Sequence, residues 1–305
     1  MKNCLTTEMK TLLHLKLFWV LLAVFLGLCA EMMLNAYSHV SSNIDYISST
    51  INGYQTYQQT DYVTINADAI TALFTTLSNM YQVFHPNMIF NNLTALLLGV
   101  GTILFPIMAV LYIGMDYGRS TVMQNKITFY GLKKVFVSKI IVILGAIVAI
   151  VLIALAIGAV YCKVMWDTNI RYLFSPVQTQ LEALSGNPIT LTTATPHNAA
   201  MLGLLFSVLI FYTFLVSLVT FLTKNSVVGI VSVFVFGYIS LPFNFTPHNV
   251  MENLITQYLF QNSASMFQYL PKTASLTTGL GVTLMAGYFV LILCGLFVIA
   301  RKQKN

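Results

Sequence analysis

The sequence predicts an all-α polytopic membrane protein with six transmembrane helices. Of its 305 residues, 57% are hydrophobic and only 8% are charged, and the mean hydropathy is +0.78. A soluble domain of this length and composition would be covered in apolar surface. Long apolar runs recur along the chain, and about 20 apolar residues are enough to cross a bilayer. One membrane domain, residues 1–305, is predicted, with spans at 15–34, 93–115, 140–161, 200–222, 226–241 and 280–300.

The distribution of basic residues predicts the orientation of these spans. Six spans place both termini on one side, and the three basic residues on the other side are Lys163, Arg171 and Lys272. The first side carries twelve: Lys2, Lys10, Lys16, Arg119, Lys126, Lys133, Lys134, Lys139, Lys224, Arg301, Lys302 and Lys304. The positive-inside rule then predicts cytoplasmic termini in the cell membrane, which we expect to be bacterial. The net charge of +6 is a topology signal on this interpretation, and it predicts no nucleic-acid partner.

The amino-terminal segment 1–16 is predicted to be an interfacial helix that leads into the first span. Its apolar residues follow helical spacing, at Met9, Leu12, Leu13 and Leu17. A cleaved signal peptide is one alternative, because the apolar stretch ends in the small residues Cys29 and Ala30. An unstructured basic tail is a second alternative for the first few residues.

The three predicted outer loops, 35–92, 162–199 and 242–279, differ in content. The first is polar, yet it carries one apolar helical face that either packs on the membrane surface or extends the second span. That face comprises Ile70, Leu73, Phe74, Leu77, Tyr81 and Phe84. In the second loop, Pro176 and Gly186-Asn187-Pro188 are interpreted as turn signals. The third loop is expected to hold short re-entrant or interfacial helices, because apolar residues recur there at helical spacing.

The chain lacks the sequence signatures of an enzyme. It contains no phosphate-binding Gly-x-x-x-x-Gly-Lys-Ser/Thr loop, no Gly-x-Ser-x-Gly elbow and no His-Glu-x-x-His pair. Ionisable residues are absent from the middle of every predicted span, which disfavours coupling to an ion gradient. We therefore expect a non-enzymatic chain whose energy comes from another polypeptide.

Metal and disulfide sites are also not predicted. Four of the five histidines fall in the predicted outer loops, at His39, His85, His197 and His248. Their spacing does not place two of them on one helical face, so we expect no metal site. Cys29 and Cys162 both fall near outer ends of predicted helices, so a disulfide between them is geometrically allowed.

The inner loop 116–139 holds most of the internal positive charge. Its apolar residues, which supply apolar faces, are Val122, Ile127, Phe129, Leu132, Val135 and Phe136. Its basic residues Arg119, Lys126, Lys133 and Lys134 are expected to stay in water. This pattern suits a short helix that lies along the membrane and docks into a groove on a partner. An ordinary basic inner loop is the alternative.

This loop resembles the cytoplasmic coupling region of ABC-2 permeases, the membrane subunits of type-2 ABC exporters. Asp116 stands at the acidic position of the family pattern, where Glu is commoner, and Ser120-Thr121 stands at the Gly-Thr position. Tyr130-Gly131 corresponds to the turn, Lys133-Lys134 to the basic pair and Lys139 to the start of the third span. The site residues that the resemblance implies are Asp116, Gly118, Arg119, Thr121, Gly131, Lys133, Lys134 and Lys139.

The resemblance extends over the layout of the whole chain, and it implies a function. Such a permease works as a dimer, with a second copy or a related permease. ATP and Mg²⁺ bind to a separate ATPase subunit. The cargo is hydrophobic or amphipathic, and a bacteriocin-like peptide is the first expectation. Two alternatives stay open: an ATP-independent carrier or channel, and a non-transporting membrane sensor or scaffold whose first outer loop binds a ligand.

Overall fold

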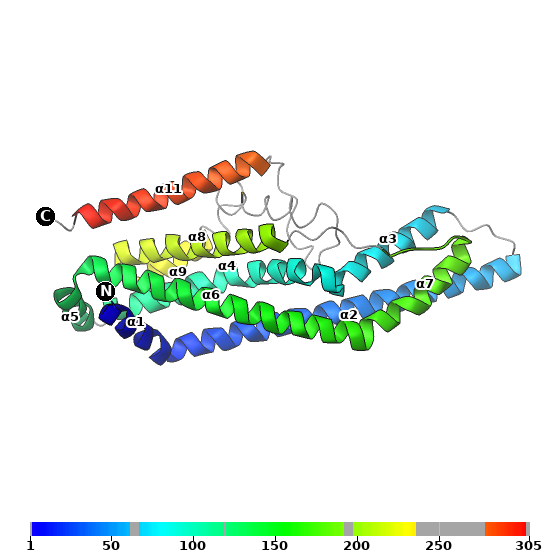
Figure 1. The fold of residues 1–305 in the computed structure, drawn as a ribbon, viewed down its shortest axis with the longest axis horizontal. Coiled ribbons are helices and arrows are strands. Elements are labelled where there is room, and N and C mark those ends of the chain that lie inside the picture. Colours follow the sequence, from blue (N-terminus) through cyan, green and yellow to red (C-terminus); the bar gives the residue numbers. More distant parts are fainter. Residues whose placement is uncertain are drawn as a thin grey trace.

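A computed structural model describes residues 2–61, 67–118, 120–191, 198–235, 250 and 278–302. These residues form helices and turns, with no strand among them. The elements are α1 (Lys2–His14), α2 (Lys16–Asp61), α3 (Ala67–Phe84), η1 (Pro86–Met88), α4 (Ile89–Gly118), α5 (Ser120–Tyr130), α6 (Leu132–Met165), the π-helical η2 (Trp166–Ile170), α7 (Arg171–Ser185), α8 (Asn198–Thr223), α9 (Ser226–Phe234) and α11 (Thr278–Lys302). Most of them run along the long axis of an elongated molecule (Figure 1). The all-helical prediction is confirmed for the described residues.

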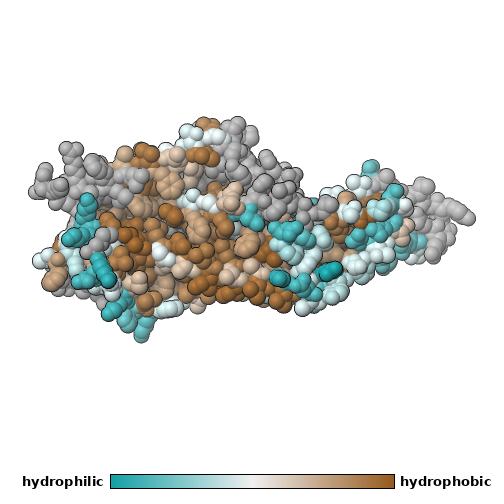
Figure 2. Space-filling view, in the orientation of Figure 1, coloured by the Kyte–Doolittle hydropathy of each residue, from teal (hydrophilic) through white to brown (hydrophobic). Residues whose placement is uncertain are grey.

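Four helical segments in the described part of the chain are long and apolar enough to cross a membrane. They are Lys16–Thr56, Val100–Tyr117, Lys133–Ser185 and Asn198–Thr223, and each overlaps one of the first four predicted spans. Figure 2 shows a broad apolar band across the middle of the molecule, with hydrophilic surface toward both ends. This band is the surface that a bilayer would cover, because hydrocarbon excludes unpaired polar groups.

The last two predicted spans overlap α9 and α11 in sequence, and neither helix is among these four segments. The helix α9 covers Ser226–Phe234, and residues 236–241 of that predicted span lie outside the described residues. The helix α11 extends from Thr278 to Lys302. The predicted outer loop 242–279 lies outside the described residues except for Val250 and the start of α11.

The centre of the bundle is α4, which contacts α2, α6, α8 and α9. Phe105 of α4 is fully buried and its ring lies 4.9 Å from that of Phe25 in α2. A Cβ atom at Gly101 would lie 3.0 Å from the side chain of Leu209, so this glycine permits α8 to pack closely on α4. Close packing of apolar helices is the main source of their association where lipid replaces water.

Two glycines position α9 against α4 and α8. A Cβ atom at Gly114 of α4 would lie 1.8 Å from Oγ and 2.8 Å from Cβ of Ser226. At Gly229 of α9, a Cβ atom would lie 2.2 Å from Oγ1 of Thr220. These contacts leave no room for a side chain on either glycine.

We predict that Gly114→Ala destabilises the protein by about 1–3 kcal/mol, the usual cost of overpacking. Because the clash is with one small side chain, Ser226→Gly in the same chain should restore most of the loss. Thermal unfolding of the purified variants in detergent measures both effects. Gly145→Ala is the matched control, since nothing lies within 4 Å of a Cβ atom there. Failure of Ser226→Gly to rescue would contradict this placement of α9.

The segment predicted as the first outer loop, 35–92, is helical over most of its described length. The helix α2 continues unbroken to Asp61, and α3 follows it. Polar composition hid an apolar row on α2, whose members Val40, Ile44, Ile47 and Ile51 are 0–2% exposed. They recur every three or four residues and therefore occupy one helical face. The predicted apolar face on α3 is helical as expected, with Leu77 and Phe84 fully buried.

The segment predicted as the second outer loop, 162–199, is also largely helical. The helix α6 passes through the π-helical turn η2 into α7 without a break, so the interpretation of Pro176 as a turn was wrong. Buried Phe174, Val177 and Leu181 on α7 offset the backbone hydrogen bond that proline removes. The turn predicted at Gly186 is confirmed, because Gly186 ends α7 with φ +68°.

Residues 35–61 of α2 together with α3 and α7 form what we call the stalk. The three helices contact one another, and Figure 1 shows them extending away from α1 and α5 at the other end of the molecule. Ser48 on α2 donates a hydrogen bond to Oε1 of Gln180 on α7, at 3.2 Å. The chain thus builds a small helical bundle on one side of the apolar band.

An aromatic cluster joins the stalk to the apolar band. The Tyr81 ring lies 5.1 Å from that of Trp166 and 5.3 Å from that of Phe174, and the His85 ring lies 4.9 Å from Trp166. His85 caps η1, because its Nδ1 accepts a hydrogen bond from the Asn87 N–H. Burial lowers the pKa of His85, which favours the neutral ring that this cap requires.

All four cysteines, Cys4, Cys29, Cys162 and Cys294, are free. The pairing of Cys29 with Cys162 that the sequence allowed is therefore not formed. Both thiols are buried within the apolar packing, where free cysteine behaves as a small hydrophobic residue.

Candidate functional site: a buried charge cluster

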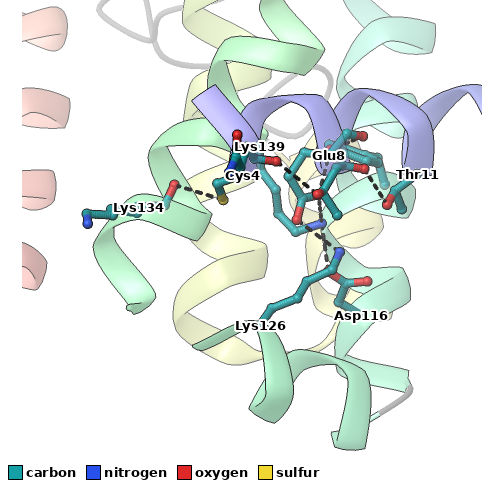
Figure 3. Close-up of polar contacts among 10 residues, drawn as sticks. Cys4, Glu8, Thr11, Asp116, Lys126, Lys134 and Lys139 are labelled. Carbon is teal, nitrogen blue, oxygen red and sulfur yellow. Dashed lines mark hydrogen bonds and ion pairs between the residues drawn. The ribbon is translucent and has the colours of Figure 1, made fainter. Parts of the chain in front are cut away.

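Four charged side chains from four different helices meet at the end of the molecule that holds α1 and α5. They are Glu8 of α1, Asp116 of α4, Lys126 of α5 and Lys139 of α6, and we call them the charge cluster (Figure 3). The cluster is therefore the point at which α1 and α5 are joined by charge to α4 and α6.

Each lysine of the cluster bridges both carboxylates. Lys126 Nζ lies 2.9 Å from Glu8 Oε1 and 2.9 Å from Asp116 Oδ2. Lys139 Nζ lies 3.1 Å from Glu8 Oε2 and 2.9 Å from Asp116 Oδ2. The contact between Lys126 and Asp116 is also a hydrogen bond, and charge-assisted hydrogen bonds are among the stronger interactions in proteins. The contacts of Lys139 are ion pairs without hydrogen-bond geometry. The four side chains form a closed ring of ion pairs, so the loss of any one of them removes one of the two partners of each oppositely charged side chain.

Tyr112 completes the polar surroundings of Glu8. Its hydroxyl donates a hydrogen bond to Glu8 Oε2 at 2.8 Å and lies 3.1 Å from the Glu8 carbonyl oxygen. The ring of Tyr112 also lies beneath Lys139, whose Nζ is 4.3 Å from the ring centroid. A cation over an aromatic face is attracted to it, more strongly when water is excluded. Tyr112 thus contacts both an acid and a base of the charge cluster.

The charge cluster is neutral and almost entirely withdrawn from water. Its side chains are between 0% and 12% exposed, and two carboxylates balance two ammonium groups. Burial lowers the pKa of Lys126, but its hydrogen bonds to Glu8 and Asp116 outweigh that effect, and the net pKa is raised. Lys126 therefore stays charged at physiological pH.

The structure separates the residues that the sequence grouped into one site. Asp116 and Lys139 belong to the charge cluster, whereas Lys133 and Lys134 are exposed on the first turn of α6. In Figure 3 the Lys134 side chain points away from the cluster, and its carbonyl oxygen faces Cys4 Sγ at 3.9 Å. Gly131 links α5 to α6 with φ +79°, a conformation that favours glycine.

For the remaining predicted site residues, the structure gives the backbone position at most. Gly118 ends α4 and Thr121 lies in the first turn of α5, and the structure describes only their backbone. Arg119 lies outside the described residues. The predicted inner loop 116–139 is thus mostly helix, consisting of α5 and the start of α6.

Sequence reasoning missed Glu8, Tyr112 and Lys126 as members of the site. Of the apolar residues predicted on α1, Leu12 is buried, whereas Met9 and Leu13 are each 48% exposed. The buried face joins Leu12 to Cys4 and Glu8. The spacing of these three residues, four apart, was a signal for one helical face. A search for apolar helical faces misses these three residues because the middle one, Glu8, is charged.

A second surface lies beside the charge cluster, at the turn from α5 to α6. Phe129 is 84% exposed there, and Lys133 and Lys134 follow within a few residues. We call these three residues the turn surface. An exposed aromatic side chain beside basic residues is typical of a protein contact site, because aromatic anchors contribute much of the binding energy at interfaces.

No group of three His, Cys, Asp or Glu side chains that could hold a metal ion occurs among the described residues. Both carboxylates of the charge cluster are already bonded to lysine. Comparison with known proteins found no matching family model, no matching curated protein and no matching solved structure. The residues of the chain are therefore the basis for assigning its function.

Proposed function

We propose that this chain is the membrane subunit of an ATP-driven exporter of the ABC-2 type. ATP and Mg²⁺ would bind to a separate ATPase subunit, and a second copy or a related permease would complete the transporter. The proposed orientation has both termini and α5 in the cytoplasm and the stalk outside, consistent with the excess of basic residues on the α1 and α5 side. The proposed cargo is hydrophobic or amphipathic.

The observation that carries this proposal is the charge cluster itself. An exporter of this kind needs a short cytoplasmic helix that is attached to the spans so firmly that a push on it moves them. Lys126 makes that attachment for α5, because it bonds to Asp116 of α4 and to Glu8 of α1 at 2.9 Å each. A displacement of α5 would therefore pull on α4 and, through Lys139, on α6.

The turn surface supplies the point where the ATPase would push. Phe129 is 84% exposed and would enter an apolar groove on the ATPase. Lys133 and Lys134 are exposed beside it and would pair with acidic residues of the groove rim. The binding contacts lie outside the charge cluster, so docking and transmission are assigned to different side chains that can be tested separately.

We predict that Lys133→Glu with Lys134→Glu reduces binding of the ATPase at least tenfold while the protein still inserts and folds. Reversal of both charges replaces attraction by repulsion, and like-charge juxtaposition costs several kcal/mol. The measurement is co-purification of a P-loop ATPase with the tagged chain after mild solubilisation, followed by its ATPase activity with the variant.

The matched control is Lys163→Glu with Arg171→Glu, which reverses two exposed positive charges on the other side of the apolar band. ATPase binding should survive in the control. Wild-type binding and ATPase stimulation in the Lys133 and Lys134 variant would show that this pair serves topology only, and would count against the proposal.

The stalk favours a second candidate function, a membrane sensor or scaffold. Its three helices have their own buried core beyond the apolar band, which is the arrangement that a receptor for an external ligand would need. In that case, gentle purification would yield no ATPase, and the charge cluster would serve only to hold the bundle together. The same co-purification experiment separates the two functions.

A further inference from the structure

The helix α1 presents two different exposed sides. Met9 and Leu13, each 48% exposed, lie one helical turn apart and form an apolar row. Lys10 and His14 form the neighbouring row and are both exposed. The third side, with Glu8 at its centre, packs on the bundle and is held in the charge cluster. The buried side of α1 thus already has its partners in the bundle. The exposed side still holds an apolar row next to a basic row.

The turn between α1 and α2 fixes α1 at the end of an apolar span. The exposed Trp19 donates a hydrogen bond from Nε1 to the carbonyl oxygen of Leu13, at 2.8 Å. Lys16 and Leu17 are exposed beside it, where α2 begins the candidate membrane span Lys16–Thr56. Tryptophan is enriched at the level of lipid headgroups. The apolar row of α1 therefore lies where the hydrocarbon of a bilayer begins.

The exposed charged side chains that the structure describes at this end of the molecule are all basic. Its two acidic side chains, Glu8 and Asp116, are both buried and bonded to Lys126 and Lys139. The lysines that the structure describes as exposed there are Lys2, Lys10, Lys16, Lys133, Lys134 and Lys224. The described acidic residues outside the cluster all lie farther along α2, in α3, in η2 or in α7: Glu31, Asp45, Asp61, Asp68, Asp167 and Glu182. Among the described residues, no exposed acidic side chain at this end of the molecule is left to compensate the lysines of α1.

We infer that α1 and the first turn of α2 bind the headgroups of anionic phospholipids, through Lys10 and Lys16, while Met9, Leu13 and Leu17 enter the acyl region. Apolar burial and attraction to anionic lipid together hold such helices at a membrane surface. The inference goes beyond the proposed export function and does not depend on it, because it requires only a membrane.

The two tryptophans of the chain, Trp19 and Trp166, make a direct test possible. In full-length Trp166→Phe, Trp19 is the single tryptophan and reports on the turn between α1 and α2. The protein is reconstituted in phosphatidylcholine vesicles that contain a minority of lipid spin-labelled near the headgroup, either phosphatidylglycerol or phosphatidylcholine. Labelled phosphatidylglycerol should quench Trp19 more strongly. The ratio of the two quenching strengths gives the association constant of phosphatidylglycerol relative to that of phosphatidylcholine. Lys10→Gln with Lys16→Gln should reduce this relative association constant by about fivefold for each lysine removed.

Salt and a matched variant complete the test. Raising the salt from 0.1 M to 1 M shortens the screening length from about 10 Å to about 3 Å and should remove the preference. Lys163→Gln with Arg171→Gln, which removes two exposed charges elsewhere, should leave the preference intact. If Trp166→Phe does not fold, the quenching of Trp19 is obtained by subtracting the fluorescence of Trp19→Phe from that of the natural chain with each labelled lipid.

Equal quenching by the two labelled lipids would overturn the inference, and so would a preference that survives the loss of Lys10 and Lys16. Absence of quenching by either lipid would place α1 away from the bilayer and overturn it as well. None of these results depends on an ATPase, so they leave the proposed export function to its own experiment.

Discussion

Replacing Glu8 by alanine is expected to lower the free energy of unfolding by about 3–5 kcal/mol, the range for removing one partner of a buried ion pair. Two lysines would then share the single carboxylate of Asp116, and the Tyr112 hydroxyl would lose its acceptor at 2.8 Å. Both lysine side chains are nearly inaccessible to water, so solvent cannot replace the lost charge. Unfolding of the purified chain in detergent, followed by circular dichroism, gives the measurement.

Two further variants separate charge from packing. Glu31→Ala removes an exposed carboxylate that bonds only locally to Asn35, and its effect should stay within about 0.5 kcal/mol. Glu8→Gln with Lys126→Gln keeps a polar side chain at both positions and restores charge balance, so it should recover much of the stability that Glu8→Ala loses. A Glu8→Ala effect no larger than that of Glu31→Ala would mean that the charge cluster does not hold α1 to the bundle.

The charge-balanced variant also tests the proposed transmission. Neutral glutamines at positions 8 and 126 would keep α1 and α5 packed, but would replace the ion pairs by weaker neutral hydrogen bonds. The turn surface would remain intact, so the ATPase should still bind. On the proposed mechanism its hydrolysis should no longer respond to the permease. A variant that binds the ATPase but does not stimulate its hydrolysis would show that the charge cluster transmits movement. A variant that does both would show that the cluster only holds the helices together.

The parts of this fold that could be predicted from sequence are those in which composition alone decides. The helix α8 carries no charged residue from Asn198 to Thr223, and its bounds lie within two residues of the prediction 200–222. Residues 35–61 of α2 show the opposite case. The Ser, Asn and Thr residues among them suggested a loop, yet one buried isoleucine per turn is enough to stabilise a helix once α3 and α7 pack on it. Tertiary packing overrode local composition there.

The candidate site was harder to predict, because its members come from four helices that are distant in sequence. Asp116 and Lys139 drew attention as charges next to apolar spans, and both belong to the charge cluster. Glu8 did not, since a single acid on a short amphipathic helix is usually assigned to the solvent side. Only the packing of α1 on α6 shows that this acid faces inward. A buried charge must find a partner, but the sequence does not say which of fifteen basic residues it is.

In the stalk, Ile47→Ala is expected to lower the free energy of unfolding by about 2–5 kcal/mol, as for other buried isoleucines. Ile47 is fully buried in the middle of the apolar row on α2, next to the hydrogen bond between Ser48 and Gln180. The cavity left by the lost atoms would weaken the packing of α2 on α3 and α7, the two other helices of the stalk. Ile47→Val, which removes one methyl group, should cost about 0.5–1.5 kcal/mol.

Tyr46→Ala is the matched control, because Tyr46 precedes Ile47 on the same helix but is 65% exposed. It should change stability by less than about 0.5 kcal/mol. Hydrogen exchange locates the effect: amides of α3 and α7 should exchange faster in Ile47→Ala, while those of α8, which lies in the apolar band, should be unchanged. Unchanged exchange in α3 and α7 would mean that α2 stands alone beyond the bilayer. A single helix of that length has no buried core with which to hold a ligand, so this result would also exclude the sensor function.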